Sequence, residues 1–351
     1  MSSQKPSLFG LKSSNRDFTS KNSWGKNQFN SSFPASLCCY LDSIGRTACY
    51  IQTAADSLKI SETSITNIFG IDPKDENTYF AFEATHSPFQ KYVIGSLPRT
   101  DLVIQNKTTG ACLAGLEVKL TALPDNTTYD LLNSDYGSEI VVRPDTIVYL
   151  ACSIARALGT SIAEEIGDGI NISNWSDARE VLPHVAKIVR SIRNISINIY
   201  SQQKPFLLQP VWKTEGKSPV LAENCLDVFC WSDGGFAYFI SCIADSNPKA
   251  TKITRQTRTA IWLYKMLLDL KSNGCFDHHK IIDELSYNTK NDKAFASAGN
   301  VTNKYMKCDR LTKPVISRTE IKNIIRGGGQ HLLSPERRFD AIIYNTPGLF
   351  S

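Results

Sequence analysis

The sequence of 351 residues has no uninterrupted apolar run of the ~18 residues that a membrane-spanning helix needs. Its most apolar segment, residues 147–157, is interrupted by Ser153 and Arg156. The first 30 residues are polar and lack the apolar centre of a secretory signal, which argues against export. Cysteine occurs 10 times, but no pair has the spacing Cys-x-x-Cys that zinc sites use. We therefore expect a cytoplasmic protein with reduced cysteines, no structural zinc and no membrane association.

Charge is unevenly distributed along the chain. Hydrophobic residues make up 42% of the sequence and charged residues 21%, which is enough apolar material for a buried core. Residues 251–351 hold 17 lysines and arginines against 9 acidic residues, whereas the preceding part is close to neutral. A basic region of this kind suits a protein that meets a polyanion such as DNA. An ordinary solvated surface with a lysine excess would have the same composition, so the motifs must decide.

Three parts are expected along the chain. Residues 1–35 form a polar arm, in which recurring aromatic residues predict docking rather than plain disorder. Residues 36–250 form the core of the protein, and residues 251–351 form a basic C-terminal part that packs on the same core. Strands and helices are interspersed without a regular βαβ rhythm or an internal repeat, so the fold class is mixed α/β or α+β.

The expected elements follow from the hydrophobic period and from turn residues. Helices are predicted near residues 37–48, at 144–158, at 175–200 with a break at Pro183, at 251–271 and at 317–326. Strands are predicted at 79–82, 91–94, 102–104, 113–123, 206–212, 226–231, 236–243 and 339–344. Residues 55–75 are expected to form a loop, and Asp233 with the two glycines after it a hairpin turn.

The residues with the clearest chemistry lie in two of these strands. Asp101 begins the strand at 102–104, and a turn at 106–110 allows the strand at 113–123 to fold back beside it. Glu117 and Lys119 are two residues apart, so they share one face of that strand, while Val118 faces the other side. Two carboxylates and an ammonium group are therefore expected to meet at this hairpin.

Such a cluster suits the hydrolysis of phosphodiesters. Two carboxylates bind a hard divalent cation such as Mg²⁺, which activates a water molecule and neutralises charge at phosphorus. A neighbouring lysine can orient the water or hold a phosphate oxygen. The bland alternative is a surface strand with Glu–Lys neighbours, because the bare spacing of Asp with Glu-x-Lys is not rare.

The longer strings around these residues carry a resemblance. Residues 99–101 and 117–119 resemble the PD-(D/E)XK nuclease core, with Arg-Thr-Asp where that superfamily often has Pro-Asp. The segments at 14–16, 24–34, 97–103 and 115–121 resemble type II restriction endonucleases of the HindVP group, and the likeness extends over most of the chain.

The resemblance implies a restriction-endonuclease-like core, in which helices flank a central mixed sheet. It also implies a homodimer that cuts both strands of a degenerate GC-rich palindrome of the form GRCGYC. Such an enzyme depends on Mg²⁺, for which Mn²⁺ can substitute, and works beside a cognate DNA methyltransferase that protects the host in a restriction–modification system.

Carried over residue by residue, the resemblance makes Asp101 and Glu117 metal ligands and Lys119 the residue that orients the water. Glu83 is a further candidate ligand, because an upstream acid often completes such sites. An exposed acid at a strand end is an equal alternative for Glu83. His86 is interpreted as a loop residue rather than as a ligand.

DNA recognition needs Arg, Lys, Asn or Gln side chains at phosphates and base edges. The candidates in the basic part and in the arm are Arg255, Arg258, Arg318, Lys322, Arg326, Gln330, Lys26 and Asn27. Three of them recur every four residues and would line one helix face: Arg318, Lys322 and Arg326. The arm suits a wrap around DNA and packing on a partner subunit equally well.

The sequence therefore predicts a type II restriction endonuclease, a Mg²⁺-dependent enzyme that cuts double-stranded DNA at a defined site and leaves 5′-phosphate ends. Two alternatives stay open. A repair or junction nuclease would use the same core but select its substrate by DNA structure. A non-catalytic basic protein would bind DNA with full salt dependence and show no metal-dependent cleavage.

Overall fold

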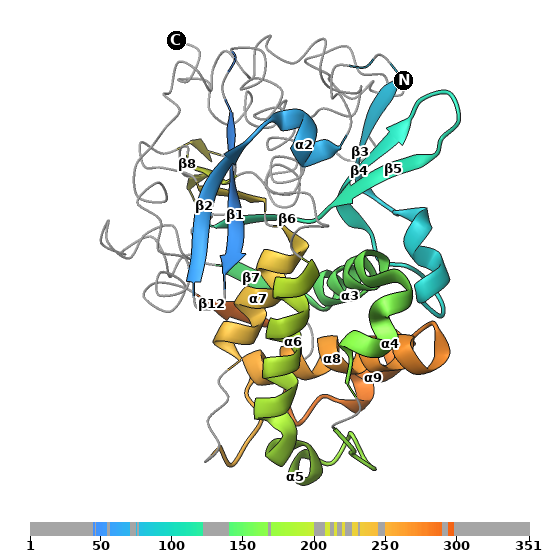
Figure 1. Ribbon diagram of the computed structural model, residues 1–351, viewed down its shortest axis with the longest axis vertical. Helices are drawn as coiled ribbons and strands as arrows, with labels where there is room; N and C mark the ends of the chain where they lie inside the picture. Colours follow the sequence, from blue (N-terminus) through green and yellow to red (C-terminus); the bar gives the residue numbers. More distant parts are fainter. Residues whose placement is uncertain are drawn as a thin grey trace, which may run out of the picture.

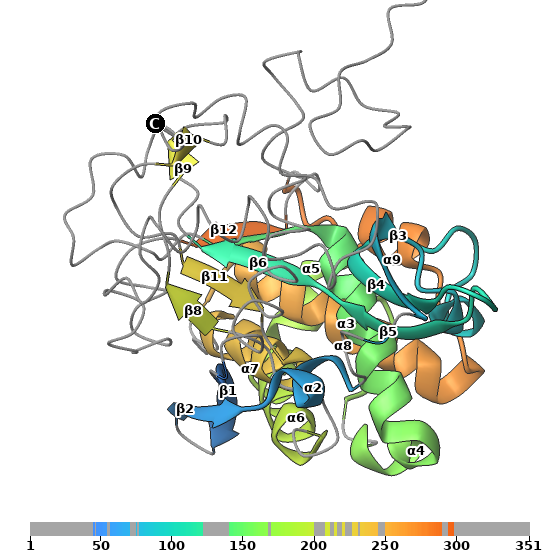
Figure 2. The ribbon, with the colours of Figure 1, turned by 90° about the horizontal axis from the view of Figure 1, so that it is seen from above.

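The computed structural model describes residues 45–121, 140–199, 208–230, 232–289 and 294–297, with short gaps at 46, 55–56, 71–74, 76, 168–169, 211–213, 216–219, 222–226 and 245–249. In this part of the chain the strands lie on one side and most of the helices on the other (Figures 1 and 2). The mixed helix-and-strand class predicted above is therefore confirmed.

Two three-stranded antiparallel sheets form the centre of the strand layer. The first has the order β3–β4–β5, and the second the order β6–β11–β8. Their strands are β3 (Thr78–Ala84), β4 (Thr100–Asn106), β5 (Cys112–Leu116), β6 (Val118–Thr121), β8 (Leu208–Pro210) and β11 (Asp227–Cys230). Because only residue 117 separates β5 from β6, one continuous stretch of chain serves both sheets.

Smaller strand pairs surround these sheets. They are β1 (Ala48–Ala54) with β2 (Ser57–Thr63), β7 (Ile140–Val142) with β12 (Phe295–Ser297), and β9 (Thr214–Glu215) with β10 (Val220–Leu221). The ladders of all these strands are antiparallel, so the parallel pairing of the predicted mixed sheet occurs in the described residues only as an isolated bridge between Val93 and Phe276.

The β4–β5 hairpin has the turn that the sequence predicts. The side-chain Oδ1 of Asn106 accepts hydrogen bonds from the backbone N–H groups of Thr108 and Thr109, at 2.9 Å each. Gly110 closes the turn with φ of +69°, a left-handed conformation that favours glycine. The ladder shifts register once, between Ile104 and Gln105, and beyond this irregularity Leu102 pairs with Leu116, which places the beginning of β4 beside the end of β5.

The helices begin and end at recognisable signals. The longest are α3 (Pro144–Leu158), α6 (Val185–Ile199), α7 (Asp233–Ile243) and α8 (Arg255–Asn273). Shorter ones are α2 (Ile65–Phe69), α4 (Ile162–Glu165), α5 (Ala178–Val181), α9 (His278–Glu284) and the 3-10 turns η1 (Ser87–Tyr92), η3 (Gly159–Ser161) and η4 (Leu182–His184). Pro144 starts α3 and Gly274 caps α8 with φ of +72°, as the sequence predicts.

The core lies between these helices and the sheets. Ile147, Leu150 and Ile154 of α3 are fully buried, and so are Ile261 and Leu263 of α8, which packs against α3. By length and composition alone the segment Pro144–Glu165 could cross a membrane, but 61% of its most apolar window is buried inside the protein. This burial is typical of a core helix of a globular protein.

The structure corrects several expected elements. Residues 236–243 form most of helix α7 instead of a strand, because Ser232 caps the helix by accepting a hydrogen bond from the N–H of Gly235 at 3.0 Å. Residues 91 and 92 end the 3-10 turn η1, where a strand was predicted at 91–94, and the expected loop at 55–75 contains β2 and α2. The long strand at 113–123 is broken at Glu117.

Other predictions lie outside the described residues. The arm at 1–35, most of the helix expected near 37–48, the helix at 317–326 and the strand at 339–344 are among them. The division of the chain into three parts stays a prediction.

Candidate active site

Asp101 and Glu117 are brought together at the junction of the two central sheets. Asp101 is the second residue of β4, and its Oδ2 accepts a hydrogen bond from the backbone N–H of Val118 at 2.8 Å. That N–H belongs to the peptide unit that joins Glu117 to Val118. The carboxylate of Asp101 therefore reaches the backbone next to Glu117, as the hairpin argument predicts.

Glu117 itself lies between two ladders. β5 pairs with β4 up to Leu116, and β6 pairs with β11 from Val118 onward, where Val118 faces Cys230. The side chain of Glu117 is partly buried, and its Oε1 accepts a hydrogen bond from the hydroxyl of Thr146 at 2.9 Å. Thr146 is almost fully buried in the first turn of α3, so the N-terminal end of α3 holds the carboxylate of Glu117.

Lys119 and Glu83 are placed by their backbones. Lys119 is the second residue of β6 and pairs with Phe229 of β11. Glu83 lies in β3 between the pairs Phe82–Leu102 and Ala84–Thr100, which puts its backbone in register with Asp101. Lys119 is thus two residues from Glu117 along the chain, and Glu83 lies opposite Asp101 in the β3–β4 ladder. The roles of their side chains stay predictions.

A third carboxylate, that of Asp233, lies close enough to Glu117 for the two charges to interact, and sequence reasoning missed it. Asp233 is the first residue of α7, and its Oδ2 accepts a short hydrogen bond from the hydroxyl of Ser153 and lies 3.3 Å from the hydroxyl of Tyr149. Burial raises the pKa of Asp233 to about 7; the bonds from Ser153 and Tyr149 act in the opposite direction, and the charge of Glu117 adds to the rise.

Tyr149 connects this carboxylate to the strand that carries Glu117. Its hydroxyl donates to the carbonyl oxygen of Gly115 at 2.9 Å. Burial, followed by the charges of Asp233 and Glu117, raises the pKa of Tyr149 well above its usual value. The signal that could have revealed the group is the presence of hydroxyl side chains at positions 146, 149 and 153 of a helix that is otherwise apolar on its buried side.

His86 supports the same strand from another side. It is fully buried, its Nε2 lies 3.3 Å from Nη1 of Arg156, and its ring packs edge-on against Phe89. A Cβ atom at Gly115 would lie 3.0 Å from Cγ of His86, so this position of β5 has room only for glycine unless the ring moves.

Asp101 and Glu117 offer the hard oxygen donors that Mg²⁺ prefers, because Mg²⁺ is bound by one or two carboxylates and keeps several waters. Among the residues that the structure describes, no group of three or more His, Cys, Asp and Glu side chains is clustered for a metal ion. Asp101 and Glu117 are candidate ligands for such an ion, because Asp101 reaches the backbone next to Glu117.

The predicted DNA contacts fare differently from one another. Arg255 is exposed at the first position of α8, whereas Arg258 is fully buried, with its guanidinium 4.3 Å from the ring centre of Trp262 and donating to the carbonyl of Ala294 at 3.3 Å. This burial argues against Arg258 as a DNA contact and for a structural role. The other candidates lie outside the described residues: Lys26, Asn27, Arg318, Lys322, Arg326 and Gln330.

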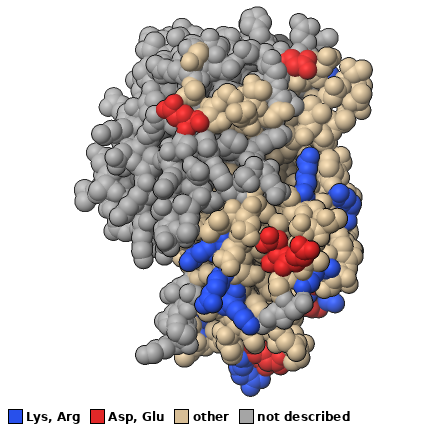
Figure 3. Space-filling model, viewed as in Figure 1, with Lys and Arg blue, Asp and Glu red and all other residues tan. Residues whose placement is uncertain are grey.

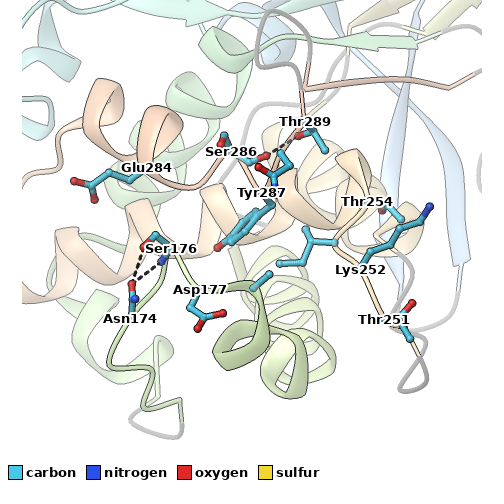
Figure 4. Close-up of a pocket in the computed structure, with 13 residues that line it drawn as sticks. Asn174, Ser176, Asp177, Thr251, Lys252, Thr254, Glu284, Ser286, Tyr287 and Thr289 are labelled. Atoms are coloured by element: carbon cyan, nitrogen blue, oxygen red, sulfur yellow. Dashed lines mark hydrogen bonds between the residues drawn. The ribbon is translucent and has the colours of Figure 1, made fainter.

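On the face shown in Figure 3, basic and acidic side chains of the described residues are interspersed. A cleft of about 930 Å³ opens elsewhere, between the start of α5, the start of α8 and the turn after α9 (Figure 4). It shares no residue with the carboxylate site. Its Asp177 is already bonded to the neighbouring Arg179, at 2.8 Å.

Comparison with known proteins identifies the family. The sequence model of the HindVP restriction endonuclease family matches residues 24–350. The chain is 53% identical over 348 residues to the probable type II restriction enzyme HindVP of Haemophilus influenzae, covering 99% of this chain and 95% of that protein. It is 43% identical over 350 residues to the type II restriction enzyme HgiDI of Herpetosiphon aurantiacus, covering 99% and 97%. No solved structure matches the chain significantly.

These matches confirm the resemblance on which the sequence analysis relied, and they extend over almost the whole chain. The chain belongs to the HindVP restriction endonuclease family, and its class of activity is that of a type II site-specific deoxyribonuclease.

Proposed function

We propose that this enzyme hydrolyses double-stranded DNA with Mg²⁺ at a degenerate palindrome of the form GRCGYC, and that Asp101, Glu117 and Lys119 carry the reaction. The observation that supports this most is the bond from the N–H of Val118 to the carboxylate of Asp101, since it brings Asp101 to the Glu117–Lys119 segment. The PD-(D/E)XK interpretation requires this proximity. The restriction-endonuclease-like core is part of the same proposal.

Each residue then has a defined task. Asp101 and Glu117 hold the ion through oxygen, with Glu83 as a further candidate ligand, and Lys119 orients the attacking water or a phosphate oxygen. A bound Mg²⁺ supplies a water of lowered pKa and neutralises charge on the phosphate. The water oxygen bonds to phosphorus while the bond from phosphorus to the 3′ oxygen breaks, which leaves a 5′-phosphate and a 3′-hydroxyl.

The proposal includes the setting of the enzyme. A palindromic site is read by a two-fold symmetric protein, so the active form is a homodimer. A methyltransferase that protects the same site in the host completes the restriction–modification system, and both proteins act in the cytoplasm. Exposed Arg255 and the basic residues beyond 300 are candidates for phosphate contacts.

Digestion of a sequenced plasmid with purified protein tests the proposal. Wild type with Mg²⁺ should give discrete fragments whose ends map to GRCGYC, and EDTA should stop the cutting. Asp101→Asn, Glu117→Gln and Lys119→Ala should each abolish cleavage while DNA binding persists. Asp283→Asn and Glu164→Gln are matched controls, because both acids are exposed on helices away from the site.

Three outcomes contradict the proposal in different ways. Cutting in EDTA would exclude the metal. Normal cutting by Asp101→Asn and Glu117→Gln would exclude the assigned ligands. Cleavage governed by DNA structure would indicate a repair or junction nuclease, and salt-dependent binding without any cleavage would indicate a non-catalytic binder.

A further inference from the structure

Helix α3 carries a row of hydroxyl groups on its buried side. Thr146, Tyr149 and Ser153 are spaced so that they fall on one face of a helix, and their exposed fractions are 1%, 6% and 8%. We call these three residues the hydroxyl row. Burying a polar group costs free energy unless the group is hydrogen-bonded. The hydrogen-bond partners of the hydroxyl row therefore indicate its structural role.

The partners of the hydroxyl row all lie at one place. Thr146 bonds to the carboxylate of Glu117, and Tyr149 bonds to the carbonyl of Gly115, two residues earlier in the same strand segment. Tyr149 and Ser153 also hold the carboxylate of Asp233. The row therefore joins the strand that carries Glu117 to the first residue of α7.

Asp233 comes to this place through the second sheet. β11 pairs with β6 so that Cys230 faces Val118, and the chain then reaches Ser232, the cap of α7, and Asp233. The N-terminus of α7 is thus tied to the residue that follows Glu117. The hydroxyls of Tyr149 and Ser153 donate hydrogen bonds to this carboxylate. Apolar side chains in the same space would avoid the cost of removing a carboxylate from water.

The backbone at Glu117 needs such support. Among the described strands, β5 lies at the edge of the first sheet and pairs with β4 on one side. Glu117 lies between the end of β5 and the start of β6, at the junction of the two ladders. Tyr149 binds a carbonyl just before this break, and Thr146 binds the side chain at the break itself.

We propose that the hydroxyl row and Asp233 position Glu117 for metal binding, by clamping the break between β5 and β6 against α3 and α7. The inference rests on the proposed function, in which Glu117 is a ligand. These four residues are positioning residues and do not touch the DNA or the ion. Loosening the clamp lets Glu117 swing away from Asp101 and weakens the metal site.

The test measures single-turnover cleavage of a plasmid by the full-length protein as a function of Mg²⁺ concentration. Loss of a group that orients a metal ligand typically costs about 10–100-fold in metal affinity or activity. Tyr149→Phe should therefore raise the Mg²⁺ concentration for half-maximal rate by about 10-fold or more. Thr146→Val, which keeps the shape of the side chain, should shift it in the same direction.

Tyr287→Phe is the matched control. The hydroxyl of Tyr287 also donates to a backbone carbonyl, that of Trp175 at 2.6 Å, but it lines the separate cleft of Figure 4. Both phenylalanine variants should lose comparable stability in urea unfolding, because each removes a hydroxyl that donates to a backbone carbonyl. Only Tyr149→Phe should change the Mg²⁺ dependence.

The outcomes separate the inference from the function on which it rests. If Glu117→Gln is inactive but Tyr149→Phe and Thr146→Val both keep the Mg²⁺ curve of wild type, the clamp has no positioning role. Should Tyr149→Phe fail to fold, Thr146→Val decides alone. If Glu117→Gln still cuts normally, the ligand assignment is wrong, and the inference falls with it.

Discussion

Replacing Asp233 with asparagine should stabilise the protein more at high pH than at low pH. Burial raises the pKa of Asp233 from 3.8 to about 7, so the folded state prefers the protonated acid that asparagine imitates. A group whose pKa is higher in the folded state contributes stability that is complete below its unfolded pKa. This contribution is lost as the pH rises through the folded pKa.

The size of the effect follows from the two pKa values. The full shift corresponds to about 4 kcal/mol, at about 1.4 kcal/mol for each pKa unit. Between about pH 5.5 and about pH 8, the wild-type protein should lose about 2 kcal/mol that Asp233→Asn does not lose. Asp233 keeps some contact with solvent, so a difference of about 1 kcal/mol still agrees with the argument.

Urea unfolding of both proteins at these two pH values measures the difference. The free energy of unfolding of Asp233→Asn, relative to wild type, should be larger at the higher pH. Asp283→Asn is the control, because this exposed residue of α9 should leave the comparison unchanged. The argument would be refuted if the free energy of unfolding of Asp233→Asn relative to wild type were the same at both pH values, or smaller at the higher pH.

Further predictions concern packing, ions and the basic region. Gly115→Ala should destabilise the protein by about 1–3 kcal/mol in urea unfolding, because the new Cβ would meet the buried ring of His86; Gly167→Ala, where nothing lies within 4 Å, is the control. Calcium should support DNA binding with little cleavage, as gel-shift and digestion assays with Ca²⁺ in place of Mg²⁺ can show, since its coordination is looser. Arg318, Lys322 and Arg326 are expected on one helix face, and neutralising all three should weaken DNA binding. The slope of log K against log salt concentration should fall in magnitude by about 0.9 for each lost phosphate contact. An unchanged slope would mean that this face is a solvated surface.

Sequence reasoning succeeded where the signals are local. The hairpin that joins Asp101 to Glu117 follows from an Asn-to-Gly turn between two apolar strands, and the structure contains both strands and the turn. Pro144 and Gly159 mark the ends of α3, and Pro183 interrupts the next helical region as expected. Each of these elements is decided by residues within a few positions of one another.

It failed where distant contacts decide. The apolar run at 236–243 is too short for its period to separate a buried helix from a strand, and Ser232 was not recognised as a helix cap. Asp233 was therefore assigned to a turn, far from the carboxylates near which it lies. Arg258 was predicted to contact DNA as part of the basic C-terminal region, but it is buried, and Trp262 and the carbonyl of Ala294 hold its guanidinium.

The positions of Thr146, Tyr149, Ser153 and Asp233 in the sequence affect the order in which parts of the enzyme fold during synthesis. The hairpin with Asp101 and Glu117 is synthesised before Thr146, and well before Asp233. Its contacts are local, so it can form early, whereas the groups that hold Glu117 come from later segments and require long-range closure. Part of the proposed clamp on Glu117, a proposed metal ligand, is therefore missing until Asp233 has been synthesised. For an enzyme that cuts DNA, this delay ties nuclease competence to a completed fold.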